Sequence, residues 1–145
     1  MKIAIGCDHG GINLKNYIEK YLESKGLEYK DMGTYTTDSC NYPDYAAKVA
    51  YAVADREADL GILVCGTGIG MSIAANKVKG IRAAAVSDCF TAQATREHND
   101  SNIICLGERI VGPGLAMRIV DTWLEASFQG GRHQVRVDMI SELEN

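Results

Sequence analysis

The sequence is poor in features that divide a chain or anchor it to a membrane. It has only two prolines, no low-complexity segment and no apolar run long enough to cross a bilayer. The apolar start of the chain, residues 1–6, is too short for a signal peptide. Because nothing in the composition marks a linker, we predict one domain that spans residues 1–145, and we expect it to be cytoplasmic.

An excess of positive charge is also absent. Lys and Arg number 15 against 19 Asp and Glu, which gives a formal net charge of −4 at pH 7. A chain with this balance has no general attraction for nucleic acid or for an anionic membrane, so we expect neither as a partner. If the ligand is an anion, a few local cations must hold it.

The sequence contains no Cys-x-x-Cys pair. Its five cysteines are Cys7, Cys40, Cys65, Cys89 and Cys105. The odd number, and the position of three of them in or beside apolar runs, predict free thiols in a reducing compartment. Cys7 and His9 lie close together, but no second pair completes a recognisable metal site, so we expect no bound metal.

Apolar runs alternate regularly with segments of helical spacing. Strands are expected at residues 2–6, 27–32, 60–64, 81–86 and 103–106. Helices are expected at residues 11–25, 46–54 (with Pro43 in the first turn), 68–77, 91–97 and 113–123. This alternation predicts an α/β fold, a Rossmann-like three-layer α/β/α sandwich with a five-stranded parallel sheet and right-handed crossovers.

One extra C-terminal helix is expected at about residues 131–143, after the break at Gly130-Gly131. No further strand follows it, so it makes no crossover. It either packs on the chain's own sheet or docks on a partner subunit, and the sequence supports the two equally.

The segment from Leu60 to Lys77 joins a buried apolar strand, a turn with three alternating glycines and a helix. The turn begins at Cys65. A helix N-terminus presents unpaired N–H groups and a partial positive charge, which bind anions and favour the thiolate form of a nearby cysteine. The pattern therefore predicts an anion site beside a reactive thiol, although Cys65 could also be an ordinary core residue and the glycines could serve only the turn.

The glycine pattern does not fit the common nucleotide motifs. A dinucleotide fingerprint would need glycine where Met71 stands, and it would normally follow the first strand. A P-loop would need a Gly-Lys-Ser/Thr sequence, which does not follow. The turn therefore predicts a site for a small anion or an oxyanion rather than for a nucleotide.

Two further turns or helix ends carry polar residues. Asp8 and His9 follow the first expected strand, and ligands of parallel α/β sheets bind outside the carboxyl ends of strands, so we expect this turn to lie beside Cys65. Asp8 could instead cap the next helix. His98 ends an expected helix, where it could cap the helix or act as a general acid.

A pair of arginines marks the last helix. Arg132 and Arg136 are four residues apart, so they share a face if the helix begins at Arg132. Two adjacent guanidinium groups suit a phosphate, and Arg109 could join them. A solvated face with ion pairs is the alternative, and His133 is expected to project elsewhere on the helix.

Taken together, these segments resemble the type B ribose-5-phosphate isomerases and the related lactose-pathway and allose-phosphate isomerases. The matching motifs run in order along the whole chain: Gly-Cys-Asp-His-Gly-Gly (6–11), Asp-Tyr-Ala (44–46), Cys-Gly-Thr-Gly-Ile-Gly-Met-Ser-Ile-Ala-Ala-Asn-Lys (65–77), Gly-Ile-Arg-Ala (80–83), Arg-Glu-His-Asn-Asp (96–100), Gly-Glu-Arg (107–109) and Gly-Gly-Arg-His-Gln-Val-Arg-Val (130–137). Each motif is weak alone, but the ordered set is specific.

The resemblance implies isomerisation of a five-carbon sugar phosphate through an enediolate, without metal or organic cofactor. It assigns the base to Cys65 and the acid that opens the furanose ring to His98. Thr67 could help to move the hydroxyl protons. The transient oxyanion would be stabilised by backbone N–H groups of the turn residues Gly66, Thr67, Gly68, Ile69 and Gly70.

The resemblance also implies the binding residues and a partner. Asp8 and Asn99 match contacts to sugar hydroxyls, and Tyr42 matches a wall of the pocket. Contacts at the phosphate end match His9, Arg109, Arg132 and Arg136. In this family the site lies between two subunits, so we expect a homodimer, or a tetramer of such dimers, with shared active sites.

Three alternatives stay open at this point. A relative specific for a six-carbon sugar phosphate, such as allose 6-phosphate or galactose 6-phosphate, would carry the same motifs. A non-catalytic module that binds phosphate or nucleotide could use the same turn. A subunit that is inactive without a different partner is the third, and the presence of both Cys65 and His98 weighs against it.

Overall fold

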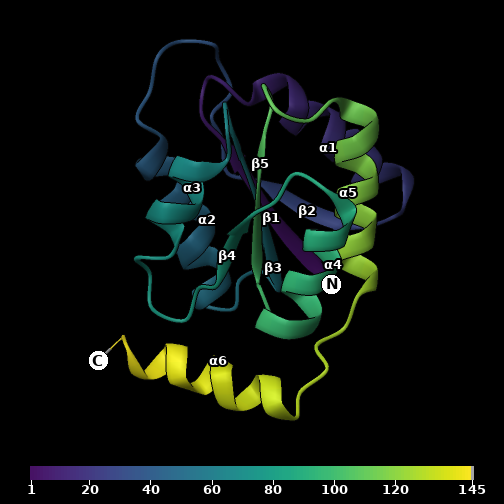
Figure 1. Ribbon diagram of the computed structural model, residues 1–145. Helices are drawn as coiled ribbons and strands as arrows, with labels where there is room; N and C mark the ends of the chain where they lie inside the picture. Colours follow the sequence, from purple (N-terminus) through teal and green to yellow (C-terminus); the bar gives the residue numbers. More distant parts are fainter. Residues whose placement is uncertain (145) are drawn as a thin grey trace.

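The computed structural model describes residues 1–144, which form one parallel sheet with helices on both faces (Figure 1). The strands are β1 (Lys2–Cys7), β2 (Glu28–Asp31), β3 (Leu60–Cys65), β4 (Ala83–Ala85) and β5 (Ile103–Gly107). The helices are α1 (Ile12–Ser24), α2 (Tyr42–Ala54), α3 (Ile69–Ala75), α4 (Cys89–Asn99), α5 (Pro113–Glu125) and α6 (Arg132–Glu142). The predicted element order and the α/β class are confirmed.

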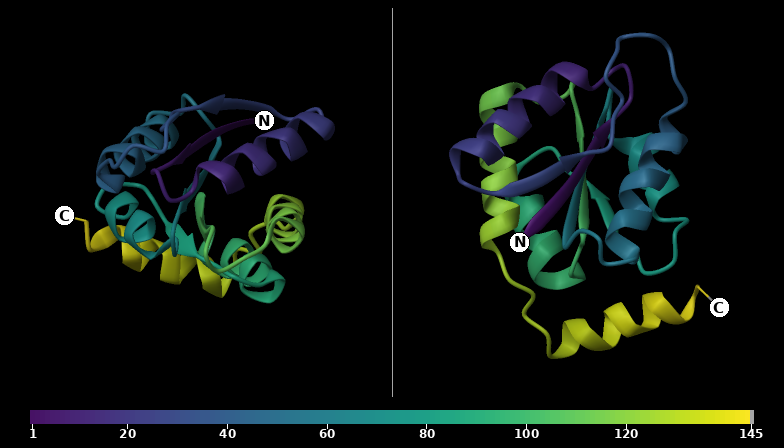
Figure 2. Two further views of the ribbon diagram at one scale, coloured as in Figure 1. Left: turned by 90° about the horizontal axis from the view of Figure 1, so that it is seen from above. Right: turned by 180° about the vertical axis from the view of Figure 1, so that it is seen from behind.

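The strand order is β2-β1-β3-β5-β4, and every neighbouring pair is parallel. Helices α1, α4 and α5 pack on one face and α2 and α3 on the other, which gives the predicted three layers (Figure 2). The chain leaves β1 toward β2 and then returns to β3 on the other side of β1. The order therefore reverses between β1 and β3, and the crevice at their carboxyl ends is where ligands of such sheets bind.

The two central strands β3 and β5 are buried along their whole lengths. Successive side chains face opposite layers, so Ile62 packs under α1 and α5 while Leu63 packs under α2 and α3. Trp123 of α5 is fully buried, and its Nε1–H donates to Ser101 Oγ at 2.9 Å. Within residues 1–144, no helix is both long and apolar enough to span a bilayer.

The edge strand β4 covers residues 83–85 rather than the predicted 81–86, and a side chain binds its free edge. The Asn76 amide accepts from Ala83 N–H at 2.8 Å and donates to Ala83 O at 2.9 Å. It therefore occupies the free edge of β4 in the way a further strand would. The same residue ends α3 two residues before the predicted end of that helix.

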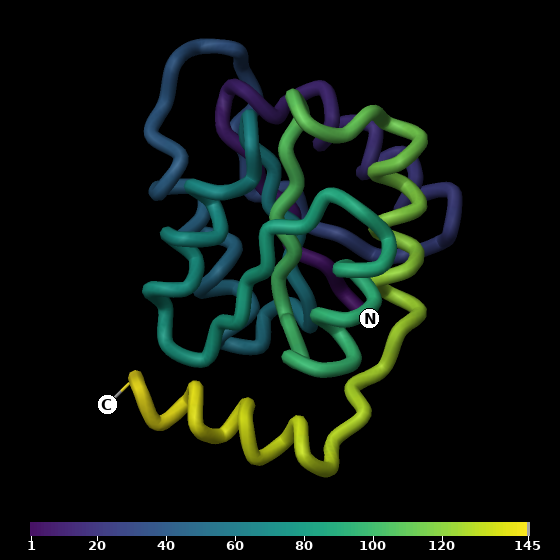
Figure 3. Tube along the Cα trace, in the orientation of Figure 1, coloured from purple at the N-terminus to yellow at the C-terminus, as the bar shows by residue number. Residues whose placement is uncertain are grey.

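Helix α6 lies outside the three layers, across the amino-terminal ends of the strands (Figures 1 and 3). Only His133 and Val137 of this helix are buried. Its other apolar side chains are exposed: Val135, Met139 and Ile140, with Leu143 just after them. It contacts the end of α4 rather than either face of the sheet.

Lys15 of α1 forms a buried ion pair that ties α1 to β2. The side chain is 2 % exposed, and Nζ donates to both oxygens of Asp31 at 2.7 and 2.8 Å and to Thr34 O at 2.7 Å. Burial raises the pKa of the neighbouring Glu19 carboxyl to about 8, and the Asp31 carboxylate adds to the rise.

We therefore expect Lys15→Met to lower the free energy of unfolding by about 3 kcal/mol, because the substitution leaves the half-buried Asp31 carboxylate without its cation. Urea unfolding monitored by circular dichroism measures the change. The control is Lys2→Met, whose ion pair with Glu28 is long at 3.8 Å and exposed, so its effect should stay within about 0.5 kcal/mol. Equal effects of the two substitutions would contradict the assignment.

Candidate active site

The glycine-rich turn after β3 holds the Cys65 thiol in a defined position. Gly68 is the N-cap of α3 and has a φ of 81°, a left-handed conformation that favours glycine. Its N–H donates to Cys65 Sγ at 3.0 Å. Cys65 is 6 % exposed at the carboxyl end of its strand. This hydrogen bond fixes the position of the thiol relative to the start of α3.

The turn that follows β5 braces the Cys65 turn. The N–H of Glu108 donates to Cys65 O at 2.9 Å, and the N–H of Arg109 donates to Gly66 O at 3.1 Å. The Arg109 side chain runs past Gly66, since a Cβ at Gly66 would lie 3.6 Å from Arg109 Cδ. Two turns far apart in the sequence therefore form one unit that carries a thiol and a guanidinium group.

Asp8 lies beside the same unit. It is 8 % exposed, and its carboxylate accepts from the N–H of Gly10 at 2.8 Å. Gly10 in turn approaches Gly66, since a Cβ at Gly10 would be 3.4 Å from Gly66 N. The predicted meeting of the β1 and β3 turns is confirmed by these contacts. The alternative that Asp8 caps α1 is wrong, because Gly11 is the N-cap and the Asp8 carboxylate accepts from Gly10, which precedes the helix.

The Glu108 side chain caps the start of α1, which is the role that was considered for Asp8. Its Oε1 accepts from Leu14 N–H, in the first turn of α1, at 2.7 Å. Glu108 thus connects the start of α1 to the turn that braces Cys65. Sequence reasoning assigned no role to this residue, although it lies inside the Gly-Glu-Arg motif.

The loop before α2 and the first residue of that helix lie against the turns after β1 and β3. The N–H of Cys40 donates to His9 Nδ1 at 3.2 Å, which holds the end of the loop against the β1 turn. The Tyr42 ring covers the start of α3, because a Cβ at Gly70 would lie 2.7 Å from Tyr42 Cε1. Tyr42 is 41 % exposed, so it forms a wall that solvent still reaches.

The remaining sequence-predicted site residues lie elsewhere. His98 and Asn99 end α4, and Arg132 and Arg136 belong to α6. Both regions lie at the amino-terminal edge of the sheet, opposite the Cys65 turn (Figure 1). Within one chain the predicted residues therefore form two separate groups, and Arg109 belongs to the Cys65 group rather than to that of the arginine pair.

His133 belongs to the second group and was missed by the sequence analysis. Its ring stacks on that of His98, with centroids 4.4 Å apart and planes inclined by 12°. Burial lowers the pKa of His133, and the charges of Arg132, His98 and Arg136 lower it further. Within residues 1–144 its Nε2 atom is buried and has no hydrogen-bond partner. His133 therefore lies buried against His98, on a different face of α6 from the exposed Arg132 and Arg136, as the sequence predicts.

Two other cysteines are core residues. Burial raises the pKa of Cys7 to about 12, and burial likewise raises the pKa of Cys105. Thiols of this kind stay protonated near neutral pH and are poor bases. All five cysteines are free, as predicted. Among residues 1–144, no cluster of three His, Cys, Asp or Glu side chains is placed to hold a metal ion.

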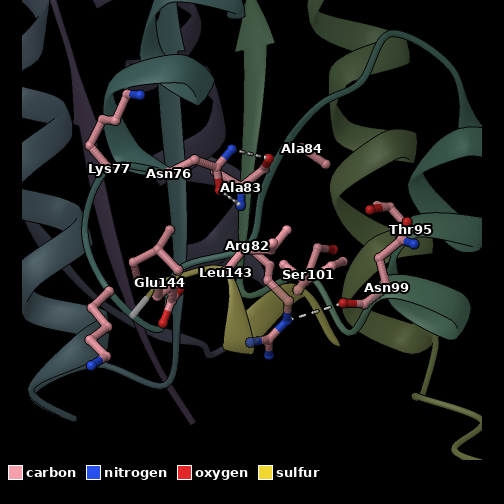
Figure 4. A pocket seen from close by; sticks show the side chains of 13 residues that line it. Asn76, Lys77, Arg82, Ala83, Ala84, Thr95, Asn99, Ser101, Leu143 and Glu144 are labelled. Carbon is pink, nitrogen blue, oxygen red and sulfur yellow. Dashed lines mark hydrogen bonds between the residues drawn. The ribbon is translucent and has the colours of Figure 1, made fainter. Parts of the chain in front are cut away.

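A cavity of about 590 Å³ opens at the amino-terminal edge, bordered by the end of α3, β4, the end of α4 and the end of α6 (Figure 4). Its lining includes Asn99 and three cationic side chains, Lys77, Lys79 and Arg82. None of the residues of the Cys65 turn lines it. Of the second group of predicted residues, only Asn99 lines the cavity.

Comparison with known proteins gives a consistent result. A sequence model of the family described as Ribose/Galactose Isomerase matches residues 3–140. Ribose-5-phosphate isomerase B of Escherichia coli (strain K12) is 52 % identical over 143 residues, which cover 99 % of this chain and 96 % of that protein.

Two solved structures extend this likeness to the fold. Ribose-5-phosphate isomerase B of Clostridium thermocellum superposes with a TM-score of 0.98 at 58 % identity and covers 99 % of this chain and 97 % of its own. The ribose 5-phosphate isomerase of Thermotoga maritima superposes with a TM-score of 0.96 at 50 % identity, with 97 % of both chains covered. The similarity therefore extends over nearly the whole chain.

Proposed function

Since the chain belongs to the ribose/galactose isomerase family and is an isomerase, we propose that it interconverts D-ribose 5-phosphate and D-ribulose 5-phosphate through an enediolate. The observation that carries the proposal is the Cys65 thiol, which lies at the carboxyl end of β3 and accepts a hydrogen bond from Gly68 N–H at 3.0 Å. Its neighbours Asp8, Tyr42 and Arg109 suit a polar, phosphorylated sugar.

Cys65 is the proposed base. The thiolate takes the proton from C2 of the open-chain aldose, the electron pair forms the C1–C2 double bond, and the carbonyl oxygen at C1 becomes an oxyanion. The thiol then returns the proton to C1 while the hydroxyl proton moves from O2 to O1. Gly68 and Ile69 already donate to Cys65 Sγ and Thr67 Oγ1. Stabilisation of the oxyanion is therefore assigned to the other N–H groups of the turn, those of Gly66 and Gly70 among them.

His98 is the proposed acid that protonates the furanose ring oxygen. The neighbouring Asn99 is proposed to bind the sugar hydroxyls. Because both lie at the opposite edge of the same chain, we assign them to the site of a second copy. The surface supports this assignment: Ile69 and Ile73 of α3 are exposed beside the Cys65 turn, and α6 leaves its apolar residues uncovered. The resulting homodimer would hold two shared sites.

The phosphate is assigned to cations and donors from both copies. His9 and Arg109 come from the chain that supplies Cys65, and Arg132 and Arg136 come from the chain that supplies His98. Two guanidinium groups four residues apart on α6 provide the forked donors that phosphate oxygens accept. This local cluster would offset the net charge of −4. The proposal places the enzyme in pentose phosphate metabolism in the cytoplasm.

The test is the ratio of kcat/KM on ribose 5-phosphate to kcat/KM on allose 6-phosphate and galactose 6-phosphate. We expect ribose 5-phosphate to lead by at least about tenfold, since one misplaced carbon in a closed site costs about 1–3 kcal/mol. A higher value for a six-carbon sugar would favour the alternative substrate class. If the protein bound these sugar phosphates without converting them, and Cys65→Ala left their affinity unchanged, the result would favour a non-catalytic module.

A further inference from the structure

Asp100 directly follows α4 and has a left-handed backbone, with φ 47° and ψ 46°. Glycine takes this conformation most readily, and Asn and Asp tolerate it better than other residues. The turn leads the chain from Asn99 toward β5. Since glycine would satisfy the backbone here, the carboxylate needs a separate explanation.

The carboxylate of Asp100 lies between two guanidinium groups from different elements. Arg96 Nη1 donates to Oδ1 at 2.8 Å from one turn back on α4, and Arg82 Nη2 donates to Oδ2 at 3.3 Å from the segment before β4. The side chain of Asp100 is 31 % exposed and those of both arginines are 21 % exposed. These charge-assisted bonds are thus partly shielded from solvent.

The same arginines bind the backbone around Asp100. Arg82 Nε donates to Asn99 O at 3.1 Å, a bond drawn in Figure 4, and to Asp100 O at 2.9 Å. Arg96 Nη1 also donates to Ser101 O at 2.8 Å. Carbonyls at the end of a helix have no partner within it, so these donors supply partners to the carbonyls of residues 99–101. Ser101 is also held by its N–H, which donates to Thr95 O at 3.1 Å, and by Trp123 Nε1, which donates to its Oγ at 2.9 Å. The two arginines thus bind the backbone carbonyls of residues 99–101, and the Asp100 carboxylate fixes the positions of both guanidinium groups.

We propose that Asp100 is a positioning residue, which through Arg82 and Arg96 fixes residues 99–101 and thereby orients His98 and Asn99 toward a sugar phosphate. This proposal rests on the proposed function, in which those two residues touch the substrate. Without the carboxylate, two guanidinium cations would face each other with no counter-charge. They would separate, and the Asn99 carbonyl would lose its donor.

The test compares Asp100→Gly and Asp100→Asn with the unchanged protein. Both substitutes accept the left-handed backbone, so we expect the melting temperature to stay within about 3 °C. We expect kcat/KM on ribose 5-phosphate to fall about tenfold or more in each, because the charged hydrogen bonds are lost. The control is Asp138→Asn. Asp138 is an exposed residue of α6 whose carboxylate accepts from Gln134 Nε2 at 2.7 Å. This substitution should change neither the melting temperature nor kcat/KM.

A double-mutant cycle separates positioning from a general structural role. In a His98→Ala/Asn99→Ala protein the targets of Asp100 are gone, so adding Asp100→Gly should lower the residual activity no more than about twofold. Full activity of Asp100→Gly, an equal loss in both backgrounds, or a loss that follows a lowered melting temperature would overturn the proposal. Full activity of His98→Ala would instead overturn the proposed function. An inactive His98→Ala beside a fully active Asp100→Gly would overturn the positioning role alone.

Discussion

Cys65→Ala should lower kcat on ribose 5-phosphate by roughly a thousandfold, the usual contribution of a well-placed general base. The substitution removes the proton acceptor and leaves the walls of the crevice in place, so KM should change little. A coupled assay of ribulose 5-phosphate formation measures both constants. Gly68 N–H, which now donates to Cys65 Sγ at 3.0 Å, would turn to water, so the fold should be retained.

A matched control distinguishes loss of the base from loss of any cysteine. Cys89 is a half-buried free thiol in the first turn of α4, and no role in the site is assigned to it. We expect Cys89→Ala to keep kcat within about twofold, as a substitution away from the site should. If Cys65→Ala stayed within tenfold of the unchanged enzyme, the thiol would not be the base.

His98→Ala should separate ring opening from proton transfer between carbons. Ribose 5-phosphate is mostly a closed furanose, so isomerisation should fall roughly a hundredfold when the ring-opening acid is lost. Ribulose 5-phosphate has its O5 blocked by phosphate and cannot close a furanose ring. The exchange of its C1 hydrogen with solvent therefore needs Cys65 but no ring-opening acid.

Proton NMR of ribulose 5-phosphate in deuterium oxide follows this exchange at C1. His98→Ala should keep the exchange rate within about threefold of the unchanged enzyme, since the base and its turn are intact. Cys65→Ala should lose exchange and isomerisation together. If His98→Ala lost both in equal proportion, His98 would be acting on the proton-transfer step or on substrate binding rather than on the ring.

Local patterns predicted the elements well where packing agreed with them. The run from Leu60 to Cys65 is apolar throughout, and it became the fully buried β3, because a central parallel strand is covered on both faces. The pattern placed residues 81–86 in one strand, whereas β4 covers only residues 83–85, where the Asn76 amide binds the backbone of Ala83. That contact is decided by tertiary structure rather than by local propensity.

The division of the site into two groups was partly readable from the sequence. Cys65 ends a strand, whereas His98 ends a helix that leads into a strand. In a parallel sheet with helical crossovers, strand ends and helix ends lie at opposite edges, so these residues could not meet within one chain. The place of Arg132 and Arg136 could not be derived this way, because no strand follows α6 and its direction is free.

Residues that act through tertiary contacts gave no local signal. The stacking of His133 on His98 depends on the path of the chain through Gly130 and Gly131, which both have positive φ. Glu108 caps α1 from 94 residues away. Both contacts join elements whose separation no spacing rule describes, so they required the folded structure.

The central claim is that each active site combines Cys65 of one copy with His98 of another. It is tested most directly by a heterodimer of Cys65→Ala and His98→Ala subunits that carry different affinity tags and are co-purified through both. In a two-fold dimer with shared sites, one site of this heterodimer contains both native residues and the other contains neither, so activity should reach about half that of the unchanged dimer. Activity that stays at the mean of the two inactive parents would contradict the claim.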